Sequence, residues 1–206
     1  MDYEGCFDQN HCLGYPEGCV NNKACDMMAS LKMSGDKVDV QLTSIISGEF
    51  DYVAMAFSDD DQMGKDLVFA CNDWWNTEYF INVNMFWNEG RSQPSNLLKE
   101  IGDTVVPTPT LSSTFQYIIA DEKPPFLICT FTLEKEVTIR GKRFDFEEGH
   151  HILLATGKIR KDVSPFGDDS LIKHDNKVAS KSKFGKHENQ TGTYIVMSIS
   201  VNIIHC

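Results

Sequence analysis

Residues 50–71 read FDYVAMAFSDDDQMGKDLVFAC, two apolar runs on either side of one polar turn. The first run, Phe50 to Phe57, combines aromatic, β-branched and small apolar side chains, which is typical of a buried strand. The second run, Leu67 to Cys71, is shorter, and the residues between the runs are rich in Asp and include Gly64, as in a turn between strands. Such a turn needs its polar residues and its glycine but not Met63. We therefore expect the Met63 thioether to be an anchor on a neighbouring surface or a soft ligand of a metal centre.

Residues Val53 to Val68 resemble the signature of a known domain family. They follow the pattern Val-Ala-x-x-Phe-Ser-Asp-Asp-x-x-Met-Gly-x-Asp-x-Val, which is similar to the core signature of the DOMON domain, above all in ferric-chelate-reductase-like proteins. The resemblance covers the chain from about Cys6 to Phe184. DOMON domains are β-sandwiches, and several hold a b-type haem between a methionine of this turn and a histidine near the end of the domain. The resemblance therefore implies that Met63 is an axial ligand of haem b.

The resemblance also implies a histidine partner for Met63. The segment Lys173 to Asn176 resembles the place in the family where the second axial ligand precedes the last strand, so His174 is the expected partner. His151, at the start of the apolar run HILLAT, is the reserve. We assign Trp74 to an apolar slot for the haem, although aromatic strand residues more often belong to a core. A thioether and an imidazole together suit a haem that transfers electrons.

Length and charge limit the function classes. A chain of 206 residues, 41% of them hydrophobic, is long enough for one domain with its own core and a tail. The formal net charge of -11 argues against nucleic acid, because phosphate binding needs clustered Lys and Arg, and against an anionic membrane surface. An acidic surface suits a basic protein partner or cations, although solvation alone also accounts for it.

Seven cysteines are many for a cytosolic chain of this size, and four lie within the first 25 residues. Their spacing is wider than that of the cysteine pairs that open zinc modules. We therefore predict three disulfides without a fixed pairing, and leave Cys206 unpaired; the six cysteines are Cys6, Cys12, Cys19, Cys25, Cys71 and Cys129. Disulfides and a glycosylation sequon at Asn189 indicate an extracellular or lumenal location, although residues 1–15 contain no apolar run typical of a signal peptide.

Short alternating or apolar runs, separated by turn residues, continue along the chain. They predict an all-β fold, an antiparallel immunoglobulin-like β-sandwich of about nine to eleven strands. We expect three parts: a disulfide-rich N-terminal segment of the domain over residues 1–26, the DOMON sandwich over 27–184, and a polar linker with an apolar tail over 185–206.

No catalytic motif accompanies this pattern, and we do not expect an enzyme in its own right. The three successive aspartates do not form an EF-hand, because Met63 and Ala70 stand at ligand positions. The preferred hypothesis is an extracellular or lumenal module that binds haem b and exchanges single electrons with a transmembrane b-type cytochrome or another redox protein. At most, the chain would be the electron-transfer module of a ferric-reductase-type oxidoreductase. The alternative is a haem-free DOMON module that binds carbohydrate or a protein partner.

Overall fold

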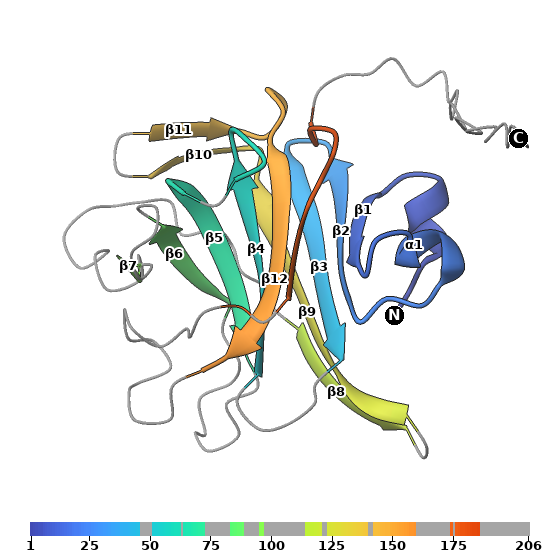
Figure 1. Cartoon of the computed structure of the whole chain (residues 1–206). Coiled ribbons are helices and arrows are strands. Elements are labelled where there is room, and N and C mark those ends of the chain that lie inside the picture. The colour runs from blue at the N-terminus through green and yellow to red at the C-terminus, as the bar shows by residue number, and fades with distance from the viewer. Residues whose placement is uncertain are drawn as a thin grey trace, which may run out of the picture.

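The computed structural model of the chain describes residues 1–45, 51–62, 64–72, 83–88, 95–96, 114–120, 123–139, 142–159, 174 and 176–185. These residues form three antiparallel sheets (Figure 1). The five-stranded sheet has the order β1 (His11–Tyr15), β2 (Met27–Ser34), β3 (Lys37–Ile45), β9 (Lys123–Glu134) and β8 (Thr114–Ala120). The six-stranded sheet has the order β13 (Asn176–Ala179), β12 (His151–Lys158), β4 (Asp51–Ser58), β5 (Asp66–Asn72), β6 (Asn84–Asn88) and β7 (Ser95–Asn96). A hairpin of β10 (Glu136–Ile139) and β11 (Lys142–Asp145) forms the third sheet.

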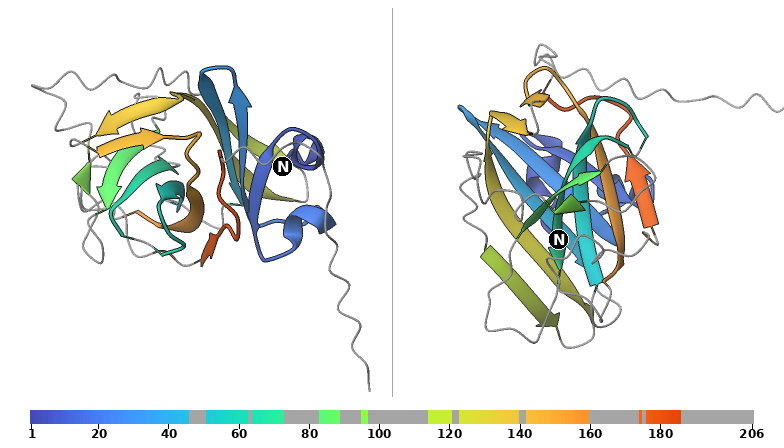
Figure 2. Two further views of the ribbon diagram at one scale, coloured as in Figure 1. Left: turned by 90° about the horizontal axis from the view of Figure 1, so that it is seen from above. Right: turned by 90° about the vertical axis from the view of Figure 1, so that its left-hand side faces the viewer.

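The two large sheets pack on each other as layers (Figure 2). Their shared core is rich in large side chains, among them Met27, Leu31, Leu42, Met55, Phe57, Phe69, Phe131, Phe144 and Phe146. In β4, alternate residues from Val53 to Phe57 belong to this core, whereas Ala54 and Ala56 belong to a second buried cluster on the other side of the sheet. Because both sides of β4 are buried, its sequence is a continuous apolar run instead of an alternating one.

This architecture confirms the predicted antiparallel β-sandwich. The described residues contain thirteen strands, more than the nine to eleven expected. Part of the excess comes from very short strands such as β7, with two residues, which no hydrophobic pattern marks.

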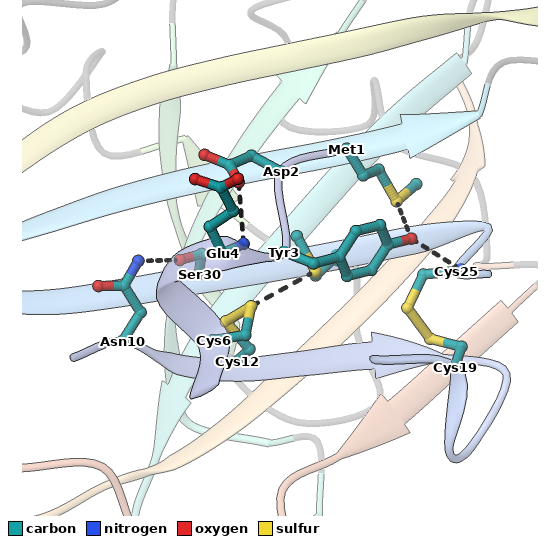
Figure 3. Close-up of a disulfide and its surroundings, with 11 residues drawn as sticks. Met1, Asp2, Tyr3, Glu4, Cys6, Asn10, Cys12, Cys19, Cys25 and Ser30 are labelled. Atoms are coloured by element: carbon teal, nitrogen blue, oxygen red, sulfur yellow. Dashed lines mark hydrogen bonds between the residues drawn. A yellow bond between two sulfur atoms is a disulfide. The ribbon is translucent and has the colours of Figure 1, made fainter. Parts of the chain in front are cut away.

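Three disulfides join the six cysteines named from the sequence, which confirms that prediction and fixes the pairing. Cys6 pairs with Cys12 and Cys19 with Cys25 within the N-terminal segment, which also contains the short helices η1 (Glu4–Phe7) and α1 (Cys19–Asn22) (Figure 3). Cys71 of β5 pairs with Cys129 of β9 and so links the six-stranded to the five-stranded sheet. Cys206 lies outside the described residues.

The N-terminal segment is built onto the sandwich through β1 and through a sulfur-rich cluster. β1 pairs with β2 along its whole length. Beside it, the Tyr3 hydroxyl accepts a hydrogen bond from the Cys25 backbone N–H at 3.0 Å and donates one to the Met1 sulfur at 3.4 Å (Figure 3). The buried Met28 packs against these groups from β2. The segment therefore contributes a strand and a small core of its own.

Residues 180–185 close the side of the sandwich next to β12. The backbones of Phe184 and His150 exchange two hydrogen bonds, and the Phe184 ring is buried in the main core. Gly185 has a φ of 91°, and a Cβ added to it would lie 1.5 Å from the Phe146 carbonyl oxygen. Only glycine fits at that position. None of the helices in the described ranges has the length and apolar character that a membrane crossing requires.

Candidate functional site

The turn between β4 and β5 is shaped by hydrogen bonds from side chains to its own backbone. The Ser58 hydroxyl accepts from the Asp60 N–H at 3.3 Å and donates to the Gln62 carbonyl at 3.4 Å. The Asp60 carboxylate accepts from the Gln62 N–H at 2.8 Å, and the Asp66 carboxylate from the Gly64 N–H at 2.6 Å. The aspartates thus act as backbone acceptors, which is the usual role of Asp in turns.

Met63 itself lies outside the described residues, but the turn on either side of it is placed. The β4–β12 pairing sets Ser58, where the turn begins, opposite His151. The β4–β5 turn and His151 therefore occupy the same end of the six-stranded sheet (Figure 1). The structure brings the reserve histidine of the sequence analysis to the turn that carries Met63.

His151 makes the kind of hydrogen bond that orients metal-binding histidines, through one of its two ring nitrogens. Its Nδ1 lies 3.0 Å from the Ser180 carbonyl oxygen. Since a carbonyl only accepts, Nδ1 carries a proton, which leaves Nε2 as the ring nitrogen that could bind a metal. Metal-binding histidines commonly donate their second ring N–H to a backbone carbonyl in this way. Ser180 is itself fixed, because its hydroxyl accepts from the Ile152 N–H at 2.9 Å.

His150 is a second histidine at this end that the sequence analysis did not assign to the site. Its side chain is buried in contact with the rings of Phe57, Phe144 and Phe146. Nε2 lies 3.0 Å from the Asp145 carbonyl oxygen and donates to it. Burial lowers the pKa of His150, so the ring is held neutral. Strand periodicity was the available signal, because His150 falls two residues before the core residue Ile152 and therefore faces inward.

Asp59 connects the turn to the β10–β11 hairpin. Its carboxylate lies 2.8 Å from Lys142 Nζ, and this hydrogen bond lowers the pKa of Asp59. The same ammonium group lies over the rings of Phe144 and Trp87, at 4.8 Å and 5.9 Å from their centres. Asp59 also faces His150, with 3.6 Å between Oδ1 and Nδ1, but a neutral imidazole makes no ion pair there. Because the Asp59 side chain is 66% exposed, the contact positions the turn more than it stabilises the fold.

Asp66 differs from the other aspartates of the turn in being buried. Only 1% of the residue is exposed. Burial raises its pKa, and the hydrogen bond from the Gly64 N–H acts in the opposite direction. A buried carboxylate is costly unless donors compensate it, so its contact with the turn backbone is a specific feature of this end of the sheet.

His174 lies at the other end of the sheet. The β12–β13 pairing sets Thr156 opposite Asn176, so His174 precedes the last strand near the Lys158 end of β12. His151 and Lys158 are separated by the length of β12, about 23 Å at about 3.3 Å per residue. The structure therefore does not bring the half-buried His174 to the Met63 turn. Trp74 lies outside the described residues.

Known proteins resemble this chain in sequence or in fold. No family model matches. A protein of Drosophila melanogaster, named as a homologue of ferric-chelate reductase 1, is 26% identical over 79% of this chain and 23% of its own length. The DOMON domain-containing protein FRRS1L of Mus musculus is 31% identical over 45% of this chain and 32% of its own length. The resemblance to the DOMON domain is confirmed. The chain spans about a quarter to a third of these relatives.

A solved structure shares the fold of this chain. The cytochrome domain of Myriococcum thermophilum cellobiose dehydrogenase superposes with a TM-score of 0.53 over 85% of this chain and 82% of that domain, at 9% identity. At this identity the similarity concerns the fold alone. This similarity is independent of the sequence relatives, because it concerns the arrangement of the strands and not the identity of the residues.

The six-stranded sheet is lined with apolar side chains on the same side as His151. Leu153, Ala56, Val68 and Phe86 form one row across β12, β4, β5 and β6, and all are buried. Ala54 and Ala70 belong to the next row. Within the described ranges, no three His, Cys, Asp or Glu residues gather in a way that could hold a bare metal ion. A haem needs only two protein ligands, since the porphyrin supplies the other four. The His151 imidazole at the end of an apolar sheet face, with a methionine in the sequence of the adjoining turn, fits that group.

Proposed function

We propose that this chain is a DOMON module that binds haem b and passes single electrons, with Met63 and one histidine as axial ligands. The observation that supports it is the pairing of Ser58 with His151, which sets an imidazole at the end of the sheet that carries the methionine turn. When bound, the haem would supply an iron that alternates between the ferric and ferrous states.

Two histidines are proposed for the second ligand position, on different grounds. The family resemblance supports His174, which precedes the last strand. The strand pairing and the Nδ1–H hydrogen bond to Ser180 support His151. Trp74 remains a proposed part of the apolar slot.

The residues of the turn would set the redox preference of the site in opposite directions. The Met63 thioether is a soft ligand and favours ferrous iron. The carboxylates of Asp59, Asp60 and Asp61 favour the ferric state, but their residues are exposed, so water screens their charge. We expect the thioether to prevail, because it bonds the iron directly.

The proposed setting is an oxidising compartment next to a membrane redox protein. Three disulfides are consistent with a secreted or lumenal location. The name of the Drosophila relative supports a transmembrane b-type cytochrome or another redox protein as the electron partner, with this chain as the DOMON part of a ferric-reductase-type assembly. We propose residues 27–184 as the DOMON sandwich, 1–26 as its disulfide-rich segment and 185–206 as a linker and tail.

The decisive experiment is a visible spectrum of the purified chain reconstituted with haem b. The wild-type chain is expected to show the sharp reduced bands of a six-coordinate b-type centre. Met63→Leu keeps the volume and apolarity but deletes the sulfur, so it should bind haem with one open position and melt at an unchanged temperature. If the wild-type chain takes up no haem where the cellobiose dehydrogenase cytochrome domain does, the electron-transfer function is wrong. The haem-free module that binds carbohydrate or a protein partner then replaces it.

A further inference from the structure

We propose that Asp66 is a positioning residue for the β4–β5 turn: its buried carboxylate fixes the backbone of Gly64, the residue that follows Met63. The functional meaning rests on the proposed haem site. The hydrogen bond from the Gly64 N–H to Asp66 can be tested in the haem-free chain.

The first observation is that Asp66 is buried where a turn residue normally meets water. Its carboxylate Oδ2 lies 2.6 Å from the Gly64 nitrogen, within the range of hydrogen bonds to charged acceptors. This donor belongs to the β4–β5 turn and offsets part of the cost of burying the carboxylate.

The second observation is that carboxylates hold the backbone on both sides of Met63. The N–H of Gln62, before it, is bonded to Asp60, and the N–H of Gly64, after it, to Asp66. Asp60 is exposed and Asp66 is buried. Because water competes with an exposed hydrogen bond, Asp66 should carry most of the ordering, and Asp60 is the natural control.

The third observation is the place of the carboxylate in the strand pairing. β4 and β5 pair Phe57 with Leu67, so Ser58 and Asp66 face each other across the last rung before the turn. Asp66 is also opposite Asn88 of β6 in the next pair of strands. Asp66 therefore lies on β5 between two paired strands, β4 and β6. A residue that positions a ligand needs this kind of support from rigid elements.

The experiment compares Asp66→Asn, Asp66→Ala and Asp60→Ala. In the haem-free chain, amide hydrogen exchange followed by NMR should show Gly64 protected in the wild type. Exchange at Gly64 should be roughly tenfold to hundredfold faster in Asp66→Ala and close to wild type in Asp66→Asn, whose amide oxygen still accepts. Asp60→Ala should leave Gly64 unchanged.

The reconstituted chain provides the second readout. Asp66→Ala should lose Met63 coordination while the folded fraction, measured by circular dichroism, stays intact. Asp66→Asn should keep six-coordinate haem, but removal of a buried negative charge should raise the ratio of reduced to oxidised haem at a fixed potential by about tenfold, equivalent to about 59 mV for one electron. A merely structural role for Asp66 would lower the melting temperature and leave both quantities unchanged.

The outcomes separate the two proposals. An unprotected Gly64 amide in the wild type, or equal exchange in wild type and Asp66→Ala, overturns the inference whether or not haem binds. Failure of the wild-type chain to bind haem, with Gly64 protected through Asp66, overturns the proposed function alone. Haem bound with unchanged coordination and potential in all three variants overturns the positioning role.

Discussion

The described contacts at the two ends of β12 can be compared. At the His151 end they include directional hydrogen bonds: Ser180 holds His151, Asp145 holds His150, and Asp66 holds the β4–β5 turn. At the Lys158 end they include close packing, since a Cβ added to Gly157 would lie 2.8 Å from the Tyr52 ring. Close packing also occurs at the His151 end, where Gly185 lies against the Phe146 carbonyl.

The difference shows what each end can support. Apolar contacts tolerate small shifts, whereas hydrogen bonds fix both distance and angle, as a group that must place an axial ligand requires. The hydrogen bonds at the His151 end are of the kind that suits a coordination site. The following experiments test that contrast.

The largest expected effect is loss of haem from one of two histidine variants. His151→Ala and His174→Ala stand at the two ends of β12, so we expect one variant to lose haem retention and the other to keep it, because one imidazole completes the site. Haem retention after desalting is the measurement. Loss only in His174→Ala would mean that the segment before β13 approaches the β4–β5 turn in the haem-bound chain. Retention in both variants would exclude His151 and His174 as required ligands.

The second experiment compares Gly185, near the His151 end of β12, with Gly157, near its Lys158 end. Gly185→Ala would set a Cβ against the Phe146 carbonyl at a φ of 91°, so both the clash and the conformation oppose it. We expect a loss of unfolding free energy of about 3 kcal/mol or more. In Gly157→Ala the new Cβ would contact the Tyr52 ring, which is a side chain and can rotate away. We therefore expect a smaller loss of unfolding free energy, about 1–2 kcal/mol. Urea unfolding measures the loss of unfolding free energy in each variant. Equal losses would contradict the expected difference between the two glycines.

A smaller effect is expected from pH at the His151 end. Burial lowers the pKa of His150 below that of the unfolded chain, about 6.5. As the pH falls, His150 is therefore protonated in the unfolded state before it is protonated in the folded state. The stability that the neutral His150 provides is complete above about pH 6.5 and is lost as the pH falls below that value. The groups around the ring, Asp59, Lys142 and Lys183, partly offset one another.

His150→Phe should flatten this pH dependence in the haem-free chain. Urea midpoints at pH 7.5 and 5.5 should differ less in the variant than in the wild type. Some dependence should persist, because burial also lowers the pKa of His11 on β1. An unchanged difference between the two midpoints would show that His150 is not a source of the pH dependence.

The smallest expected effect is that of removing residues 186–206. The cut keeps Phe184 in the core and Gly185 against Phe146, and the sequence of residues 186–192 is polar. The melting temperature should stay within the error of the measurement. A large fall would show that the tail supplies core contacts and that the proposed boundary at residue 184 is misplaced.

The sequence predicted the elements better than their arrangement. The strands on either side of the Met63 turn and the six bridged cysteines followed from local patterns, because apolar runs and cysteine spacing are local properties. Which histidine stands near the turn depends on the pairing of β12 with β4 and β13, between segments far apart in the sequence. No local pattern encodes that choice. The burial of Asp66 was hidden for the same reason, since the sequence shows it only as one more aspartate of a polar turn.

The disulfide between Cys71 and Cys129 has a mechanical consequence. A force that pulls on the two termini of the chain passes through this bond and bypasses the residues between the two cysteines. With a separation of 58 residues, roughly 200 Å of contour length is withheld from extension. In a single-molecule pulling experiment, reduction of the bond should therefore appear as an added step of about that length. For a module tethered to a surface, the bond limits how far the chain can be drawn out after its strands separate.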